Sequence, residues 1–412
     1  MAKRAKKSKK NMHNKAIKYR IYPSLEQEEY FSKVFGCTRK IWNLMLNDRQ
    51  ESYKTTGKQI VLLPKAYKED YPYLKEVDSL ALCNAYLDLN KAYKDFFKNP
   101  KHFKLPKFKS KKNRKDSYTI NNQDGTIAII DNKYIKLPKA GLVEAKIYRS
   151  PKDDWSLKSA TISRNKAGEY YASVLFEFKE KIKKQSLLKV KRAYENDINN
   201  KENTNAKPKT TKALDTVIGL DYKSDGLYTD SNGVTLGSPK FYRKSQKKLA
   251  KAQRKLAKKL GFRKGETKSN NYIKQLEKIA KISNHISNQR KDFLHKESTK
   301  IANSYDVVCV ESLNMKNMSN KGFHNGKATL DNGYGMFLNF LEYKLKNRGK
   351  YFIKVDKWFP SSQICSKCGH TQKMPLDVRT YVCPECGNII DRDINAAINI
   401  KNEGLRLLLE SA

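Results

Sequence analysis

Four cysteines near the end of the chain have the types and spacing of a zinc site. They form two Cys-x-x-Cys pairs separated by fourteen residues: Cys365, Cys368, Cys383 and Cys386. Four thiolates in two such pairs are a common tetrahedral ligand set for structural zinc. A glycine follows each pair, Gly369 and Gly387, where the chain has to fold back toward the sulfurs. We therefore predict a zinc ribbon over residues 362–387, with His370 at its surface rather than among the ligands.

Three carboxylates elsewhere in the chain suit a harder metal ion. Asp221 and Glu311 each end an apolar run typical of a buried strand, and Asp393 stands at the start of an alanine-rich helix. Metals bind in α/β sheets at the C-terminal ends of strands, and a helix N-terminus favours negative charge. Converging there, the three acids would hold two magnesium ions about 3.5–4 Å apart, one generating an attacking hydroxide and one stabilising a leaving 3′ oxygen. Oxygen ligands suit magnesium and thiolates suit zinc, so the two sites should not compete.

The start of the last helix offers two acids, Asp391 and Asp393. Aspartate is a preferred N-cap, so an acid here either binds metal or only caps the helix, and capping is the more common case. The residues alone leave both roles open. The surrounding elements have to decide between them.

The apolar patterns around the acids predict one α/β unit. A strand ending in Asp221 is followed by a hairpin, two long helices, a strand ending in Glu311, a helix, another strand, the ribbon and the Asp393 helix. The predicted strands are 216–220, 226–229, 234–236, 307–310 and 351–355, and the predicted helices are 244–260, 272–303 and 336–347. This order of elements is that of an RNase H-like fold, so the fold class is multidomain α/β with the zinc ribbon inserted before the last helix.

The N-terminal half has a different pattern. Residues 17–22 alternate as in a half-buried strand, and Ser24 with Gln27 forms a capping-box pattern that opens a helix with apolar Leu25, Phe31 and Val34. Further helical stretches follow around residues 41–46 and over 80–97. Short strands are then predicted at 117–120, 126–130, 134–137, 144–148, 159–164 and 170–178. Their Asn-, Asp- and Gly-rich turns indicate a small β-barrel.

Two polar segments are predicted to lie outside these units. Residues 1–14 form a lysine-rich arm, which we expect to be disordered until it meets phosphate. Residues 181–215 are rich in lysine and asparagine and nearly free of aromatic residues. That composition indicates a linker or an exposed insertion.

The charge of the chain indicates nucleic acid as its partner. Among 412 residues, 85 lysines and arginines oppose 42 acids, for a net charge of +43. Residues 102–115 interleave two phenylalanines with basic residues, which fits either base stacking or a basic loop with two anchoring aromatics. From Arg243 to Lys264, eleven basic residues occur without an acid, which favours a nucleic-acid face over a merely solvated one. The candidate contacts are Lys18, Arg20, Arg39, Lys40, Phe103, Phe108 and Arg254.

The sequence argues against a membrane role. No apolar run approaches the ~18 residues of a membrane span, and the basic residues are spread through every region instead of lining one amphipathic helix. We expect a cytoplasmic protein of a prokaryotic cell, associated with the nucleoid when bound to DNA. Cys37, Cys83 and Cys309 stand alone in apolar contexts and are predicted to be core thiols rather than disulfide partners.

Several motifs also resemble a known family. They are residues 14–43, IGLDYKSDGLYTDSNG at 218–233, VVCVESLNM at 307–315, and the ribbon followed by DRDINAAINI at 391–400. On these motifs the chain resembles TnpB (OrfB), the transposon-encoded RuvC-like nucleases related to type V CRISPR effectors, over nearly its whole length. The chain departs from many relatives where Tyr222-Lys223 replaces a glycine after the first acid. This substitution could crowd the metal site.

The resemblance implies Asp221, Glu311 and Asp393 as the catalytic acids. It selects Asp393 over Asp391, because the acid directly before the x-Asn-Ala-Ala run is the catalytic one in the wider family. It also implies a guide RNA derived from the transposon end, a double-stranded DNA target, and a short adjacent motif read by the N-terminal half, between about residues 38 and 94. The implied domains are a β-barrel wedge (15–24 and 115–180), a helical recognition domain (25–114), and a RuvC-like nuclease (216–361 and 388–412).

Three functions compete on this reasoning. An RNA-guided, magnesium-dependent DNA endonuclease is favoured because all three acids are present in the order that the fold requires. The alternatives are a non-catalytic guided DNA-binding or transposition accessory protein, and a DDE-type transposase that moves DNA itself. A relaxase is excluded, because the six histidines form no His-hydrophobe-His pair.

Overall fold

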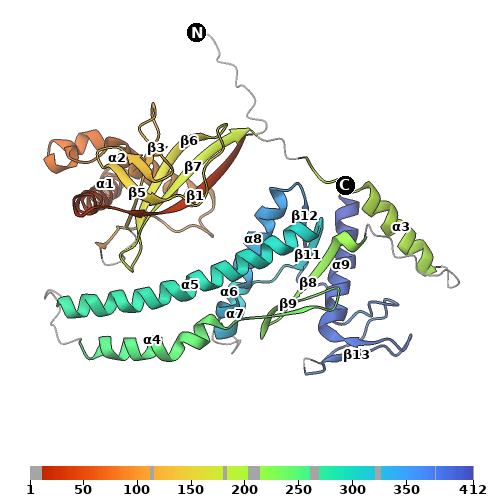
Figure 1. Cartoon of the computed structure of the whole chain (residues 1–412). Coiled ribbons are helices and arrows are strands. Elements are labelled where there is room, and N and C mark those ends of the chain that lie inside the picture. Colours follow the sequence, from red (N-terminus) through yellow and green to blue (C-terminus); the bar gives the residue numbers. More distant parts are fainter. Residues whose placement is uncertain are drawn as a thin grey trace, which may run out of the picture. The chain divides into compact units, whose positions relative to one another are not determined.

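The chain forms two compact units, Met1–Lys181 and Ile182–Ala412. The computed structural model describes residues 12–111, 116–179, 183–202, 214–259, 269–320, 326–375 and 377–411 (Figure 1). Most of the predicted basic arm, the end of the aromatic and basic segment, much of the predicted insertion and the last part of the cationic run lie outside these residues. Each unit is described by itself below.

The first unit is built on a seven-stranded antiparallel sheet with the order β2-β6-β7-β1-β5-β4-β3. The strands are β1 (Met12–Tyr22), β2 (Asp116–Asn121), β3 (Ala128–Ile130), β4 (Tyr134–Leu137), β5 (Gly141–Lys146), β6 (Ser156–Arg164) and β7 (Tyr170–Lys179). β1 pairs with both β5 and β7, so the N-terminal strand joins the sheet formed by residues 116–179. In the described residues the pairing ends at β2 and β3, so closure into a barrel stays a prediction.

Local sequence explains the start of this unit. Ile17, Tyr19 and Ile21 are buried on one face of β1, as their alternation predicts. Ser24 then caps α1 (Leu25–Thr56), and its side chain and that of Gln27 form the predicted capping box. α1 is one continuous helix, so the prediction of two helical stretches was wrong. Leu25, predicted to lie on the apolar face, is 82% exposed because it precedes the buried stripe.

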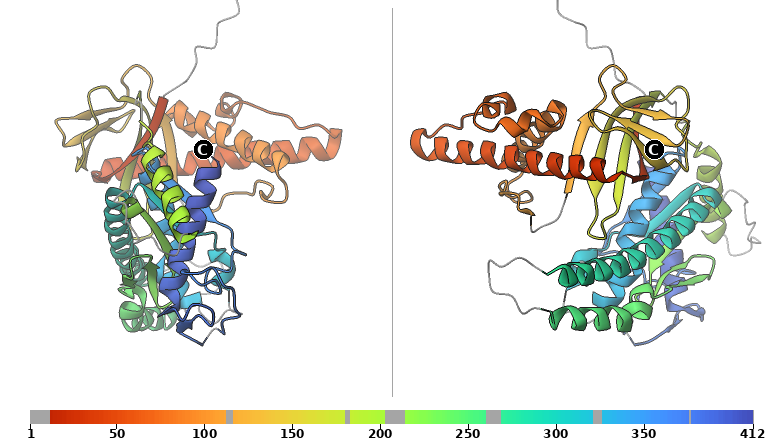
Figure 2. Two further views of the ribbon diagram at one scale, coloured as in Figure 1. Left: turned by 90° about the vertical axis from the view of Figure 1, so that its right-hand side faces the viewer. Right: turned by 60° about the vertical axis from the view of Figure 1, so that its left-hand side comes forward.

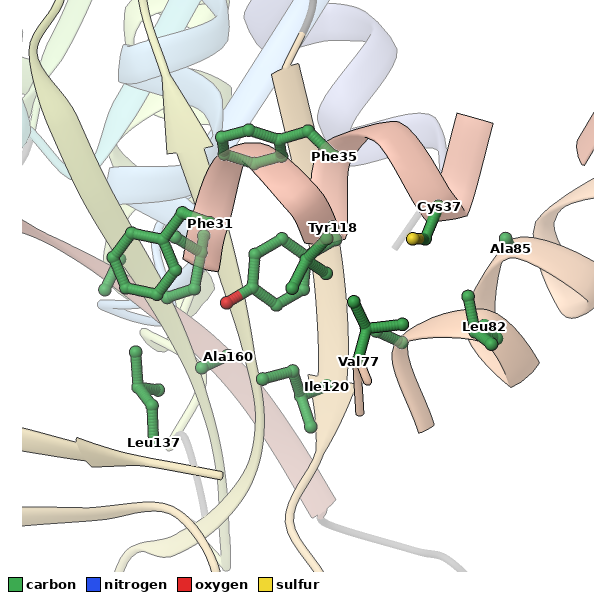
Figure 3. Packing of buried hydrophobic residues seen from close by; sticks show 14 of the residues in the cluster. Phe31, Phe35, Cys37, Val77, Leu82, Ala85, Tyr118, Ile120, Leu137 and Ala160 are labelled. Atoms are coloured by element: carbon green, nitrogen blue, oxygen red, sulfur yellow. The ribbon is translucent and has the colours of Figure 1, made fainter. Parts of the chain in front are cut away.

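Two helices cover the sheet of the first unit. α2 (Ser79–Lys98) is capped by Asp78 and packs beside α1, and Figure 2 shows both helices extending beyond the strands. Figure 3 shows Phe31 and Phe35 of α1 against Tyr118 of β2; the rings of Phe35 and Tyr118 meet edge to face at 5.6 Å. These aromatic contacts attach α1 to the sheet. Two short 3-10 helices, η1 (Pro64–Lys68) and η2 (Pro72–Lys75), connect α1 to α2.

The second unit contains a five-stranded mixed sheet with the order β10-β9-β8-β11-β12. The strands are β8 (Val217–Tyr222), β9 (Gly226–Asp230), β10 (Thr235–Gly237), β11 (Val307–Glu311) and β12 (Tyr351–Val355). The first three form an antiparallel hairpin series, whereas β8, β11 and β12 run parallel. All five predicted strands are present. Parallel strands buried on both faces require continuous apolar runs, such as Val307-Val308-Cys309-Val310.

Helices cover both faces of this sheet. The helices of this unit are α3 (Leu188–Glu202), α4 (Phe241–Ala257), α5 (Asn270–Ser304), α6 (Met315–Met318), α7 (Gly326–Asn332), α8 (Tyr334–Lys346) and α9 (Arg392–Glu410). Val308 and Val310 pack into one core with residues of α5 and α8. Val307 and Cys309 point the other way, into a core with α3 and α9. The alternation along β11 therefore separates the two layers.

Two further expectations need correction. Residues 188–202 form α3, whose Val190 and Ala193 are buried, where a linker or exposed insertion was expected. Cys83 is exposed, while Cys37 and Cys309 are buried as predicted. None of the helices in the described part of the chain combines the length and the apolar composition that crossing a bilayer requires.

Candidate active site and cysteine cluster

The three predicted acids line one cavity of about 490 Å³. Asp221 lies near the C-terminal end of β8 and Glu311 is the last residue of β11. β8 and β11 are parallel neighbours, and Leu220 lies opposite Val310. Asp221 and Glu311 are the next residues of the two strands, so both acids lie at the same edge of the sheet. Asp393 is the second residue of α9, which packs on β8. The structure thus brings together two strand ends and a helix start.

Two of the acids in this cavity, Asp221 and Glu311, have raised pKa values. Burial, helped by the carboxylates of Glu311 and Asp393, raises the pKa of Asp221 to about 8. Burial also raises the pKa of Glu311 to about 7. Negative charge is therefore costly here without a cation. Carboxylate oxygens are the ligands that magnesium prefers, so the donor set and its electrostatics fit this ion.

Lys223 supplies a positive charge at this site that sequence analysis did not assign. Its Nζ lies 2.7 Å from Oδ2 of Asp393. Tyr222 lines the cavity, but its ring lies 4.8 Å from that of buried Tyr334. Of the two residues expected to crowd the site, Lys223 is the one whose side chain forms an ion pair with an acid.

Asp391 has the capping role that the sequence left open. Its Oδ1 accepts hydrogen bonds from the backbone N–H groups of Asp393 and Ile394 at 2.9 and 3.1 Å. This is N-cap geometry for α9. Asp393, by contrast, directs its carboxylate to Lys223 and lines the cavity.

The rim of the cavity carries aromatic and cationic side chains. Trp358 is 80% exposed, and Nζ of Lys357 lies 4.4 Å from the centre of its ring. Arg379 and Arg392 line the same cavity. An exposed indole beside cations suits a base and its phosphate. Sequence analysis assigned the cysteines that follow Trp358 but gave Trp358 itself no role.

A buried tyrosine lies close to the acids. Tyr334 is fully buried, and its hydroxyl has no hydrogen-bond partner in the part of the chain that the structure describes. Burial, followed by the nearby carboxylates of Asp221 and Glu311, raises its pKa well above the usual value for tyrosine. Sequence analysis missed this residue, because a tyrosine at a helix start carries no chemical signature.

The four predicted cysteines form one cluster with ligand atoms all within 4.8 Å of one another. Sγ of Cys365 lies 3.7 Å from that of Cys386, and Sγ of Cys368 lies 3.6 Å from that of Cys383. Tetrahedral zinc–thiolate geometry requires about 3.8 Å between sulfurs. The cluster therefore suggests a zinc site. Among the residues described, it is the one group of three or more possible ligands at this spacing, and neither His370 nor the three acids belong to such a group.

The cysteine loops have the backbone turns that their glycines predict. Gly369 and Gly387 have φ values of 81° and 65°, in the left-handed region that favours glycine. Each glycine N–H donates to the carbonyl of the first cysteine of its pair, Cys365 or Cys383. A short hairpin, β13 (Thr380–Val382) with β14 (Ile389–Asp391), joins the second pair to α9. Figure 2 shows this region at the N-terminal end of α9, opposite the C-terminus.

Four of the nucleic-acid candidates in the first unit are engaged with neighbouring side chains. Nζ of Lys18 and Cζ of Arg20 lie 4.2 and 5.1 Å from the ring centre of Tyr171. Arg39 lies 3.5 Å from Asp116, and Lys40 lies 4.4 Å from the ring centre of Tyr71. These contacts give the four cations a structural role within the unit.

The aromatic candidates remain accessible. Phe103 and Phe108 are 42% and 52% exposed, and Phe108 shares a cavity of about 300 Å³ with Arg39. The segment that carries them is fastened to α1, because Asn43 both donates to and accepts from the backbone of Lys109. The loop is therefore anchored by polar contacts, while its phenylalanines stay available for stacking. Arg254 lies exposed on α4 in the other unit.

Family models match three parts of the chain. A Cas12f1-like TNB domain matches residues 334–400, a probable transposase of the OrfB_IS605 type matches residues 193–322, and a helix-turn-helix domain of the same type matches residues 12–58. In this chain the last of these regions is β1 followed by the single helix α1. The four-cysteine cluster and the first part of α9, with Asp393, fall in the region matched by the Cas12f1-like TNB domain.

Two named proteins resemble this chain over nearly its whole length. The chain is 31% identical to a Streptomyces pristinaespiralis protein provisionally named an RNA-guided DNA endonuclease, over 95% of this chain and 89% of that protein. It is 27% identical to a similarly named Escherichia coli K12 protein, InsQ, over 95% of this chain and 93% of the relative.

A solved structure shows the fold of the chain, and the sequence relatives show its family. The protein of the Cas12f1–sgRNA–target DNA complex superposes with a TM-score of 0.57 at 15% identity, over 95% of this chain and 99% of that one, so the chain is a mixed α/β protein with the Cas12f1 fold. On the sequence relatives, it belongs to the TnpB (OrfB) family.

Proposed function

We propose that this protein is an RNA-guided DNA endonuclease that hydrolyses phosphodiester bonds at the cavity lined by Asp221, Glu311 and Asp393. One observation carries the proposal: three acids from two adjacent strand ends and one helix start line the same cavity, in a chain with a net charge of +43. The names of the relatives support guidance by RNA and DNA as the target.

Sheet topology supports an RNase H-like (RuvC) assignment for residues 216–361 and 388–412. The order β10-β9-β8-β11-β12 places β8, the first strand of this unit, in the middle of the sheet, with β11, the fourth, on one side and the antiparallel hairpin on the other. In sheets with parallel strands, catalytic groups gather outside the carboxyl ends of those strands. Asp221 and Glu311 lie at such ends.

The acids of the chain would hold magnesium, and the cysteines would hold structural zinc. Magnesium bound at this site supplies the positive charge that polarises water and offsets the charge of the leaving oxygen. Asp221 and Glu311 would contribute oxygens from the sheet and Asp393 an oxygen from α9. Metal binding would require Asp221 and Glu311 to release protons, because their pKa values are raised to about 8 and 7.

The rest of the chain would bind the guide and the target. We assign residues 15–24 and 115–180 to a wedge domain, residues 25–114 to a recognition domain, and residues 362–387 to the zinc ribbon. The pairing of β1 with β5 and β7 supports the first of these assignments. A guide RNA from the transposon end would select the target by base pairing, beside a short motif read by the first unit.

The test is cleavage of a matched target by protein purified with RNA from its native locus, in magnesium. Asp221→Asn should lower the cleavage rate by about a thousandfold or more, because several kcal/mol of transition-state stabilisation depend on the metal ligand. Guide and target binding should change little. Asp225→Asn is the matched control, because Asp225 is an exposed acid four residues further along the chain.

Three results would overturn the proposal. Cleavage by Asp221→Asn at the wild-type rate would remove the assignment of this cavity. Tight target binding by the wild-type protein without any nicking in magnesium would instead identify a non-catalytic guided DNA-binding protein. Joining of DNA ends in a strand-transfer assay would identify a transposase.

A further inference from the structure

We propose that Asn395 is a positioning residue that couples the zinc cluster to Asp393, so that zinc and the catalytic metal ions bind cooperatively. The proposal rests on the proposed function, in which Asp393 is a metal ligand. It goes further by giving the zinc cluster a direct part in building the active site.

Asn395 holds the first cysteine loop from both sides of a zinc ligand. Its side chain is completely buried, Nδ2 donates to the carbonyl of Ile364 at 2.7 Å, and Oδ1 accepts from the N–H of Ser366 at 2.9 Å. Ile364 and Ser366 flank Cys365, so one carboxamide fixes both peptide groups around this thiolate. A buried carboxamide with both ends satisfied defines one orientation.

Asn399 adds a second attachment one helical turn later. Its Nδ2 donates to the carbonyls of Ser361 and Ile364 at 2.8 and 2.7 Å. Asn395 and Asn399 lie four residues apart and therefore on the same face of α9. This face fixes the segment that leads into the first cysteine pair.

The second cysteine loop reaches the same helix through the backbone. β14 follows Cys386, pairs with β13, and ends at Asp391, the N-cap of α9. The N–H of Arg392 donates to the carbonyl of Arg379 at 2.8 Å, which ties the first turn of α9 to the start of the hairpin. The hairpin and the helix start therefore form one continuous structure.

These contacts close a ring when the four sulfurs share a metal. From α9 the ring passes through Asn395 to the first cysteine loop, across the cluster to the second, and along β14 back to Asp391. Asp393 belongs to the segment of the ring that runs from Asp391 to Asn395. Without the cross-link between the cysteine pairs, hydrogen bonds and strand pairing alone would hold the first turn of α9.

The consequence is a thermodynamic coupling. Zinc at the cysteines restricts the position of Asp393. The first turn of α9 therefore loses less conformational entropy when the acids bind their own metal. Partners that orient metal ligands typically change metal affinity by about 10- to 100-fold when they are removed. Asn395→Ala should therefore weaken metal binding at the acids, although the side-chain hydrogen bonds that it removes go to the first cysteine loop.

The experiment measures Mn²⁺ binding to the zinc-loaded full chain, because Mn²⁺ takes the same oxygen ligands and reports its binding by electron paramagnetic resonance. Asn395→Ala should raise the dissociation constant by about tenfold or more. It should also speed the release of zinc to a chromophoric chelator. Asn402→Ala, the same change about two turns further along α9 at a partly exposed position, is the matched control and should do neither. Saturating Mn²⁺ should slow zinc release from the wild-type protein, since coupling is reciprocal.

The possible failures are distinguishable. Loss of a Mn²⁺ site in Asp393→Asn, together with unchanged Mn²⁺ affinity in folded Asn395→Ala, would overturn the coupling and keep the active site. If wild-type protein binds no Mn²⁺ that depends on Asp393, the proposed function itself fails. Should Asn395→Ala not fold, zinc release from the wild-type protein decides the question, because coupling is reciprocal. Equal rates of zinc release with and without saturating Mn²⁺ would overturn the coupling.

Discussion

Lys223 and Asp393, 170 residues apart in sequence, form an ion pair of 2.7 Å inside the candidate active site. The hydrogen bond to Asp393, opposed by partial burial, raises the pKa of Lys223 above its usual value. The chain therefore supplies a cation of its own to one of the three acids. A metal ion that uses this oxygen has to displace the ammonium group.

Removing that ammonium should make the acids easier to saturate with magnesium. Lys223→Met should lower the magnesium concentration that gives half-maximal cleavage by up to about fivefold, because a partly exposed ion pair contributes about 0.2–1 kcal/mol. Lys223→Arg keeps the charge and should stay close to wild type. A higher magnesium requirement in Lys223→Met would show that the lysine helps to build the metal site instead of competing with it.

Trp358 should bind an unpaired base of the DNA strand that enters the cavity. Stacking on an aromatic side chain contributes about 1–3 kcal/mol per base, so Trp358→Ala in an Asp221→Asn background should weaken binding of a short oligodeoxythymidine by about fivefold or more. Trp358→Phe keeps a stacking surface and should lose less. Fluorescence anisotropy of the labelled oligonucleotide measures both. Equal affinities of the alanine variant and its parent would remove the tryptophan from the binding site.

The sequence predicted the elements whose burial pattern is strong and local. The alternation of Ile17, Tyr19 and Ile21 predicted β1, and the Ser24–Gln27 pattern predicted the capping box, because each depends on neighbours within a few residues. The paired cysteines also predicted their own cluster, since their spacing encodes the geometry of the ligands.

The misses have a common physical cause, which is long-range packing. α1 continues through Gly36, which lies inside the helix that had been predicted as two stretches. α3 buries only a narrow stripe that includes Val190 and Ala193, so its polar sequence hid a packed helix. The contacts of Lys223 with Asp393 and of Asn395 with the first cysteine loop join distant segments, and neither has a local signal.

The raised pKa values make the stability of the metal-free active site depend on pH. Burial first, and then Glu311 and Asp393, raise the pKa of Asp221 to about 8, well above the value of about 4 in an unfolded chain. Between about pH 4 and pH 8, the Asp221 carboxyl of the folded state therefore holds a proton that the same group has released in the unfolded state. The free energy of unfolding should be highest below pH 4 as far as this group is concerned, and this contribution should be lost as the pH rises through 8.

Thermal unfolding of zinc-loaded, magnesium-free protein between pH 6 and pH 9 tests this pH dependence. The loss should approach about 1.4 kcal/mol per pH unit for each full proton of difference, and magnesium should reverse it more effectively at higher pH. Asp221→Asn cannot titrate, so its pH profile should be flatter and it should be the more stable protein near pH 9. Parallel profiles for the two proteins would contradict the raised pKa.

The close approach of α9 to β8 should make Gly219 irreplaceable. A Cβ atom at this position would overlap the carbonyl oxygen of Ala397 and lie 2.7 Å from the backbone nitrogen of Lys401. Both obstacles belong to the backbone of α9, so the helix that carries Asp393 would have to move away from the sheet. Gly219→Ala should therefore lower the free energy of unfolding by about 3 kcal/mol or more and reduce cleavage in the fraction that folds. Gly237→Ala is the matched control, because no atom of the described chain lies within 4 Å of the added methyl group and φ is not positive there. A Gly219→Ala protein with the thermal stability and cleavage rate of Gly237→Ala would show that the position of Asp393 does not depend on this contact.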